Sequence, residues 1–141
     1  MRRILKVLLV TIFIVVLTGC SKKIDKLSYT DYNEYFSNKE GYSVIDDTNK
    51  YDIDVRRYLE AGNGDIQVFY LEFSNEKNAN KYIKDNYKKL KKKEYKNYTY
   101  IKDTKNKYMK LYKVKNVIVI GNTNENKNKR LLNKTLKELG F

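Results

Sequence analysis

The chain has 141 residues and a formal net charge of +13, and it contains no His, no Pro and only one Cys. The lack of His excludes Ser-His-Asp and Cys-His nucleophilic sites and any His-ligated metal. A single Cys excludes an intrachain disulfide and a thiolate zinc site. The length suits a single domain with its own hydrophobic core.

The first twenty residues have the layout of a secretory signal. Basic residues at positions 2, 3 and 6 precede an apolar run from Val7 to Leu17, and small residues follow that run. This order of basic start, apolar centre and small residues is typical of a signal peptide. The alternative is a membrane-spanning anchor, which we disfavour because the apolar stretch is shorter than the about 20 residues that a span needs.

The segment Leu17-Thr18-Gly19-Cys20 ends the apolar run. All four positions resemble the lipobox of bacterial lipoproteins, in which a diacylglyceryl group is attached to the Cys thiol and the chain is cut just before that Cys. The resemblance implies a lipidated Cys20, cleavage between Gly19 and Cys20, and a protein held on the extracytoplasmic face of the cell membrane. Covalent diacylglycerol on Cys20 is the only cofactor expected.

Three segments follow from this interpretation. Residues 1–19 form a cleaved signal peptide, residues 20–28 hold the lipidated Cys and a polar tether, and residues 29–141 form a single α+β domain. The mature chain carries a net charge of +10, because residues 1–19 contain three basic and no acidic residues.

The first predicted helix runs from Thr30 to about Lys39. Thr30 can cap the free amides at its start, and Tyr32 and Phe36 lie one turn apart on one face. Gly41 suits the left-handed residue that follows a helix.

Three strands are predicted next, at residues 42–46, 51–61 and 66–73. Alternate residues of the second strand share a face, which Arg57 interrupts. A buried Arg57 would need a carboxylate partner, whereas at a strand end its side chain would reach solvent, and the sequence leaves both open. The turn from Gly62 to Asp65 joins the second and third strands as a hairpin.

The second half repeats this plan. Ser74 is the predicted N-cap of a second helix, whose apolar stripe is Ala79, Ile83, Tyr87 and Leu90. Strands are predicted at residues 98–102, 107–114 and 117–122, with Lys115-Asn116 as a two-residue turn. Thr123 is the predicted N-cap of the last helix, whose stripe is Leu131, Leu132, Leu136 and Leu139.

The predicted fold is α+β, an antiparallel sheet of about six strands with three helices mainly on one face. Residues 42–48 align with 98–104, and residues 74–90 align with 123–139, so a strand-strand-strand-helix unit occurs twice. Doubling would also be compatible with two adjoining half-domains. Chance identity is the alternative, because Lys (25), Asn (16) and Tyr (14) dominate the composition.

Charge is distributed unevenly. Residues 20–74 hold 7 basic and 11 acidic residues, and residues 75–141 hold 20 basic and 6 acidic. The Lys-rich stretch suggests contact with an anionic surface, either lipid headgroups or a cell-wall polymer, through Lys84, Lys88, Lys89, Lys92 and Lys93. A solvated helix face in a Lys-rich composition is the favoured alternative. Nucleic acid is disfavoured, because Tyr82 and Tyr87 belong to the apolar stripe.

Four acids lie within nine residues, namely Asp46, Asp47, Asp52 and Asp54. They could hold Ca²⁺ or act as acid and base, but the calcium-loop pattern fails because Asp52 stands where Gly is needed. A polar turn between two strands is the favoured interpretation. No metal is expected.

Two function classes therefore remain. The favoured one is a small non-catalytic lipoprotein, a binding or accessory module that contacts an envelope component or a partner protein at the membrane. The alternative is a lipid-anchored hydrolase that uses carboxylates such as Asp46, Asp47 or Asp54, although no catalytic motif supports it.

Overall fold

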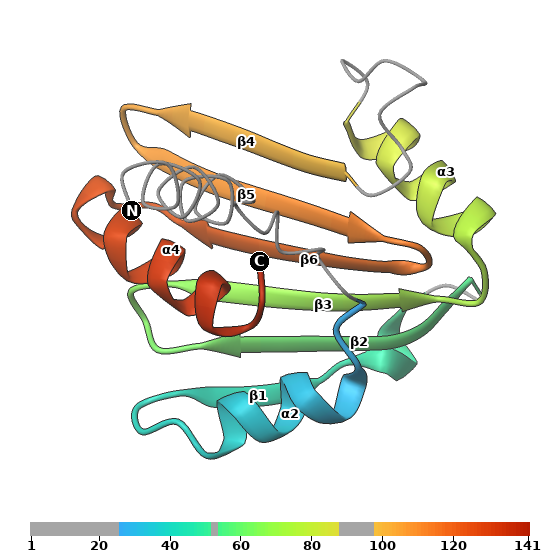
Figure 1. Cartoon of the computed structure of the whole chain (residues 1–141), viewed down its shortest axis with the longest axis horizontal. Helices are drawn as coiled ribbons and strands as arrows, with labels where there is room; N and C mark the ends of the chain where they lie inside the picture. The colour runs from blue at the N-terminus through green and yellow to red at the C-terminus, as the bar shows by residue number, and fades with distance from the viewer. Residues whose placement is uncertain (1–25, 52–53, 88–97) are drawn as a thin grey trace, which may run out of the picture.

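Six antiparallel strands form one sheet in the order β1-β2-β3-β6-β5-β4 (Figure 1). The structure is a computed structural model, which describes residues 26–51, 54–87 and 98–141. The strands are β1 (Ser43–Asp46), β2 (Val55–Gly62), β3 (Gln67–Phe73), β4 (Tyr98–Thr104), β5 (Lys107–Val114) and β6 (Val117–Thr123). The predicted α+β class and the six-stranded antiparallel sheet are confirmed.

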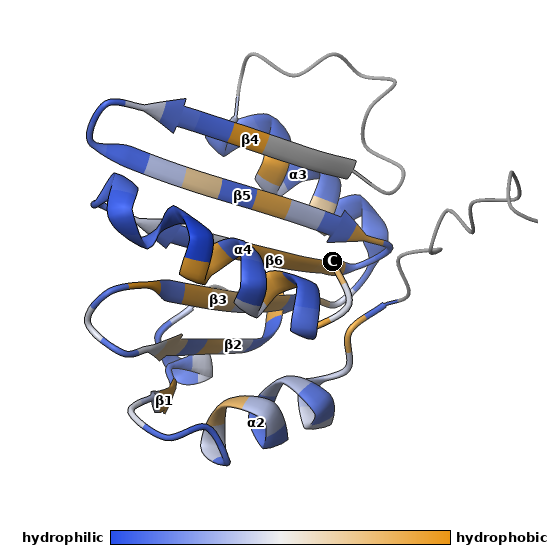
Figure 2. Ribbon diagram, turned by 60° about the vertical axis from the view of Figure 1, so that its left-hand side comes forward, coloured by the Kyte–Doolittle hydropathy of each residue, from blue (hydrophilic) through white to orange (hydrophobic). Residues whose placement is uncertain are grey.

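Within the described residues, three α-helices accompany the sheet, α2 (Tyr29–Ser37), α3 (Glu76–Asn86) and α4 (Lys129–Glu138). The described loops hold two short 3₁₀ segments, η1 (Thr48–Lys50) and η3 (Asn126–Asn128). Figure 2 shows α2 and α4 in front of the sheet and α3 behind it. Two of the three helices thus share a face, and α3 covers part of the opposite face, to which the sequence analysis had not assigned it.

The face under α2 and α4 carries the larger core cluster. Tyr32 and Phe36 of α2 and Leu132 and Leu136 of α4 are buried there against alternate residues of the strands. Each fully buried Leu contributes about 1.5–3 kcal/mol of apolar transfer free energy. Gly121 of β6 lies directly under α4, and a Cβ atom at this position would stand 2.7 Å from Leu132 Cδ1. The absence of a side chain at Gly121 therefore lets α4 approach the sheet closely.

The face under α3 carries the second cluster. Ala79 and Ile83 of α3 are fully buried, and they pack with Leu71, Phe73 and Ile118 of the central strands. Tyr82 packs beside them, with its ring centroid 5.3 Å from that of Phe73. Ala79 and Ile83 bear out the first half of the predicted stripe, Tyr87 is partly buried at the helix end, and Leu90 lies outside the described residues.

The helix starts differ by one or a few residues from those predicted. Ser28, not Thr30, caps α2, because its Oγ accepts the Asp31 amide at 3.0 Å. Asn75, not Ser74, caps α3, because its Oδ1 accepts the Asn78 amide at 2.9 Å.

The last helix also starts later than predicted. Thr123 does not cap α4: it ends β6, and its hydroxyl donates to the Asp65 carbonyl at 2.8 Å. Chain from Asn124 to Asn128 then leads into the helix. Because this connection is long, the helix that follows β6 can pack on either face of the sheet.

The second strand is shorter than predicted, and its alternation breaks at a bulge. Tyr51 lies outside β2 and stacks on Tyr58, with ring centroids 4.1 Å apart. The register of β2 against β3 shifts between Val55 and Arg57. Val55 therefore packs in the α3 cluster, whereas Leu59 packs in the α2 and α4 cluster. The prediction that alternate residues of the strand at 51–61 share one face is wrong, because a bulge adds a residue to one strand.

The strand-strand-strand-helix order occurs twice, and the two meanders join through β3 and β6. A two-fold rotation about an axis normal to the sheet would exchange these central strands, but each face of the sheet would be mapped onto itself. It cannot bring α3 onto α4, because these helices lie on opposite faces. The two halves therefore share strand topology and differ in where the helix goes.

Candidate functional site

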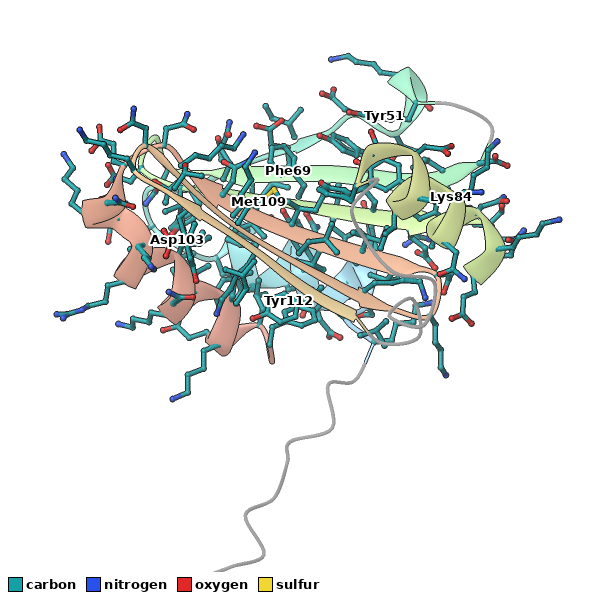
Figure 3. All side chains as sticks on the ribbon, turned by 90° about the horizontal axis from the view of Figure 1, so that it is seen from above. Tyr51, Phe69, Lys84, Asp103, Met109 and Tyr112 are labelled. Carbon is teal, nitrogen blue, oxygen red and sulfur yellow. The ribbon has the colours of Figure 1, made fainter. Side chains whose placement is uncertain are left out.

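The predicted lipidation and anionic-surface residues lie mostly outside the described part of the chain. Gly19, Cys20, Lys88, Lys89, Lys92 and Lys93 fall in the undescribed ranges. Lys84 is described, and its side chain is exposed on α3. Figure 3 shows Lys84 on α3, at one end of the molecule.

The predicted acids are engaged in separate local contacts. Asp46 accepts the Thr48 amide at 3.0 Å, and hydrogen bonds from Thr48 lower the pKa of that carboxyl. Asp47 pairs with Lys50 at 2.7 Å. Asp54 accepts from Asn78 Nδ2 at 2.8 Å and so ties the β1–β2 connection to α3.

These contacts are those of a polar turn, the interpretation that the sequence favoured. Asp52 lies outside the described residues. Among the residues that the structure describes, no three His, Cys, Asp or Glu side chains are grouped so that they could hold a metal ion.

Arg57 lies at the surface. Its guanidinium carbon is 4.1 Å from the centre of the Tyr29 ring, and its side chain is exposed. Glu72 is its cross-strand partner in β3, and the carboxylate of Glu72 pairs with Lys26 at 3.3 Å. Of the two alternatives left open by the sequence, the structure shows the exposed one. Arg57 therefore helps to fasten the start of the domain to the sheet.

A polar hollow of about 430 Å³ lies at the other end of the sheet. The β2–β3 turn, the end of β6 and the start of η3 surround it. Its lining residues are Ser43, Ile45, Glu60, Gly62, Gly64, Asp65, Gln67, Asn122, Thr123, Asn124, Glu125 and Asn128. Three of these are carboxylates and none is Lys or Arg, so the hollow is acidic although the whole chain is strongly basic.

The floor of the hollow follows from the register of the strands. Ser43, Gly62, Gln67 and Asn122 are successive cross-strand partners, and Ile45, Glu60, Phe69 and Ile120 form the neighbouring row. Phe69 and Ile120 belong to the α3 cluster, so both rows lie on the α3 face. Figure 3 shows Phe69 and Met109 on that face, in the part that α3 leaves uncovered.

Hydrogen bonds hold the polar walls in place. Gln67 Nε2 donates to Glu60 Oε1 at 3.0 Å, and Asn128 Nδ2 donates to Asp65 Oδ1 at 3.1 Å. The Asp65 carbonyl also accepts from Thr123 Oγ1. Neither Glu60 nor Asp65 has a Lys or Arg partner among the described ion pairs, and both remain available to a cationic group.

The first strand forms one margin of the hollow and is also an edge of the sheet. Within the described chain β1 pairs only with β2, so its outer amides and carbonyls have no ladder partner. Ile45, at its centre, is 49% exposed. The second edge strand, β4, carries a similar residue, Ile101, which is 52% exposed. The two edges differ in charge, because β4 lies in the basic half of the sequence and β1 in the acidic half.

Sequence reasoning did not find the hollow. Its residues come from three stretches that the β1–β2 and β3–β6 pairings bring together, and none forms a motif. The acidic excess of residues 20–74 was the one available signal. Scans against protein-family models, curated proteins and solved structures found no match. No helix in the described residues has the length and apolar character needed to span a membrane.

Proposed function

We propose that this protein is a lipoprotein whose Cys20 carries diacylglycerol, and that its domain is a non-catalytic binding module on the extracytoplasmic face of the cell membrane. The hollow at the β2–β3 turn is its binding site. One observation carries the binding part of this proposal: the site and the start of the domain lie at opposite ends of the same strand.

Lys26 begins the described domain and pairs with Glu72, near the end of β3, whereas Gln67 lines the hollow at the start of β3. Glu72 is five positions beyond Gln67 along the strand, a distance of about 17 Å at 3.3–3.4 Å per residue. Leu27 is buried in the core, so the domain is fastened from this residue onward.

The anchor and the site are therefore compatible in space. The chain between Cys20 and Lys26 can span at most about 20 Å when extended. A lipid on Cys20 would keep the Lys26 end close to the membrane and leave the hollow facing away from it. This arrangement suits a module that binds a partner in the envelope rather than the membrane itself.

The test of the anchor is metabolic labelling with a fatty-acid probe in a bacterial host. We expect the wild-type chain to be labelled and to sediment with membranes, and Cys20→Ala to lose the label, because the thiol is the attachment point. Two or more acyl chains are needed for stable anchoring, since one chain binds only marginally. Ser21→Ala is the matched control and should retain the label. A labelled Cys20→Ala chain, or an unlabelled wild type, would contradict the proposal.

A further inference from the structure

We infer that the β1 edge and the hollow beside it accept an extended cationic peptide segment, which adds to the sheet as a seventh strand. This inference deepens the proposed binding role and names its partner by chemistry: a chain segment that alternates Lys or Arg with aliphatic residues.

The backbone of β1 supplies the first part of the argument. All four residues of β1 lie at the edge, three of them are exposed, and no Pro or Lys blocks the strand. An edge strand of this kind offers a row of free donors and acceptors to another extended chain. Strand addition of this type draws affinity from main-chain hydrogen bonds and specificity from the neighbouring side chains.

The side chains next to that edge supply the second part. A residue of the added strand opposite Ile45 would extend the row that continues through Glu60 and Phe69. Ile45 is half exposed and would be covered by the apolar stem of a Lys at that position. Glu60 lies two strand spacings, about 10 Å, from the added strand. A Lys side chain bridges that distance to the carboxylate when its stem lies over Ile45.

Charge selects between the two edges of the sheet. The hollow beside β1 contributes Glu60 and Asp65 with no cation in its lining, and Glu125 pairs with Lys127 at its far wall. The β4 edge has Lys102 within the strand, Lys105 in the turn that follows and Lys107 at the start of β5. A cationic segment is therefore attracted to β1 and repelled from β4.

The test uses the full-length protein in nanodiscs of zwitterionic lipid, with empty nanodiscs as the blank. The probe is a fluorescein-labelled nine-residue peptide in which Lys alternates with Ile and Thr, and the readout is fluorescence anisotropy. We expect saturable binding that weakens as salt rises, because screening reduces the contribution of exposed charges. A peptide with Glu in place of Lys should not bind. A Lys peptide with alternate amides methylated should not bind either, because it lacks donors on the pairing edge.

Variants locate the site. Ile45→Ser and Glu60→Gln should each weaken binding by about two- to fivefold, the effect expected for one half-exposed apolar contact or one exposed ion pair. Ile101→Ser and Glu34→Gln are the matched controls, one exposed isoleucine on the other edge and one exposed acid on α2, and should leave binding unchanged. Hydrogen exchange should slow at the β1 amides when the peptide is present.

Several results would overturn the inference. It fails if the methylated peptide binds as well as the parent peptide, or if Ile101→Ser weakens binding and Ile45→Ser does not. It also fails if Ile45→Ser converts an oligomer of the free protein to a monomer, which would make a second copy the occupant of the edge. An unlabelled wild-type chain would overturn the anchor and leave these binding results standing, so the two proposals fail separately.

Discussion

The contact between Gly121 and α4 gives a prediction that can be worked out in free energy. An alanine Cβ at position 121 would lie 2.7 Å from Leu132 Cδ1 and 3.0 Å from Leu136 Cδ1. Carbon atoms at optimal contact are about 3.5–4.0 Å apart, so the side chains of α4 must move. Overpacking of this kind costs about 1–3 kcal/mol, and we expect Gly121→Ala to lower the free energy of unfolding by that amount.

Truncation of Leu132, which faces Gly121, should relieve part of the cost of Gly121→Ala. Leu132 is fully buried, so Leu132→Ala alone should cost about 2–5 kcal/mol, partly because it leaves a cavity over Gly121. In the double variant the new methyl group fills part of that cavity. We expect Gly121→Ala and Leu132→Ala together to cost at least about 1 kcal/mol less than the sum of the single changes.

Ile83 provides the control. It is as fully buried as Leu132, but it lies on the opposite face of the sheet. Ile83→Ala should also cost about 2–5 kcal/mol, and its effect should add to that of Gly121→Ala within about 0.5 kcal/mol. Urea unfolding followed by far-ultraviolet circular dichroism measures all five variants. Additive effects of Gly121→Ala and Leu132→Ala would refute the reasoning, because they would mean that α4 does not pack on Gly121.

Two predictions concern pH. Hydrogen bonds from Lys39 and Tyr35 lower the pKa of Glu138, so its contribution is present near neutrality and is lost as pH falls below about 4.5. Urea unfolding should show that Glu138→Gln is less stable than the wild type by about 0.2–1 kcal/mol near neutral pH. In acid the two proteins should be equally stable. A difference in the free energy of unfolding that stays constant with pH would argue against this ion pair. Burial raises the pKa of Tyr82 to about 12 and raises that of Tyr32 further, so stability should fall as pH rises above about 10, where tyrosines of the unfolded chain ionise. Spectrophotometric titration should show a late group of tyrosines that ionise only as the chain unfolds, and a single early transition of all 14 would contradict this.

Periodicity predicted the elements well where local chemistry decides them. The Lys115-Asn116 turn forms as expected, with Lys115 at a φ of +54°. Helix starts were displaced because two polar residues compete for each cap: Ser28 lies just ahead of the predicted Thr30, and Asn75 follows the predicted Ser74. The cap is the residue whose extended backbone aims its side chain at the first free amides, and that backbone is set by tertiary packing.

Local sequence patterns could not predict on which face of the sheet each helix packs, nor where the hollow lies. An apolar stripe such as that of Ala79 and Ile83 shows that a helix is buried and leaves open which side of the sheet buries it. The hollow depends on Gln67 facing Asn122 across β3 and β6, a pairing between residues far apart in the sequence. Only the β2–β3 hairpin, which sets Gly62 opposite Gln67, was within reach of local signals.

The sheet order also has a consequence for the time course of folding. Within each meander the paired residues are close in sequence, at most 19 positions apart, as for Ser43 and Gly62. Pairs between β3 and β6 are 45 positions apart for Glu72 and Val117 and 55 for Gln67 and Asn122. Closing a longer loop costs more chain entropy, so each meander can form early as a local hairpin structure. The β3–β6 ladder, and with it the hollow, is then the last part of the sheet to assemble.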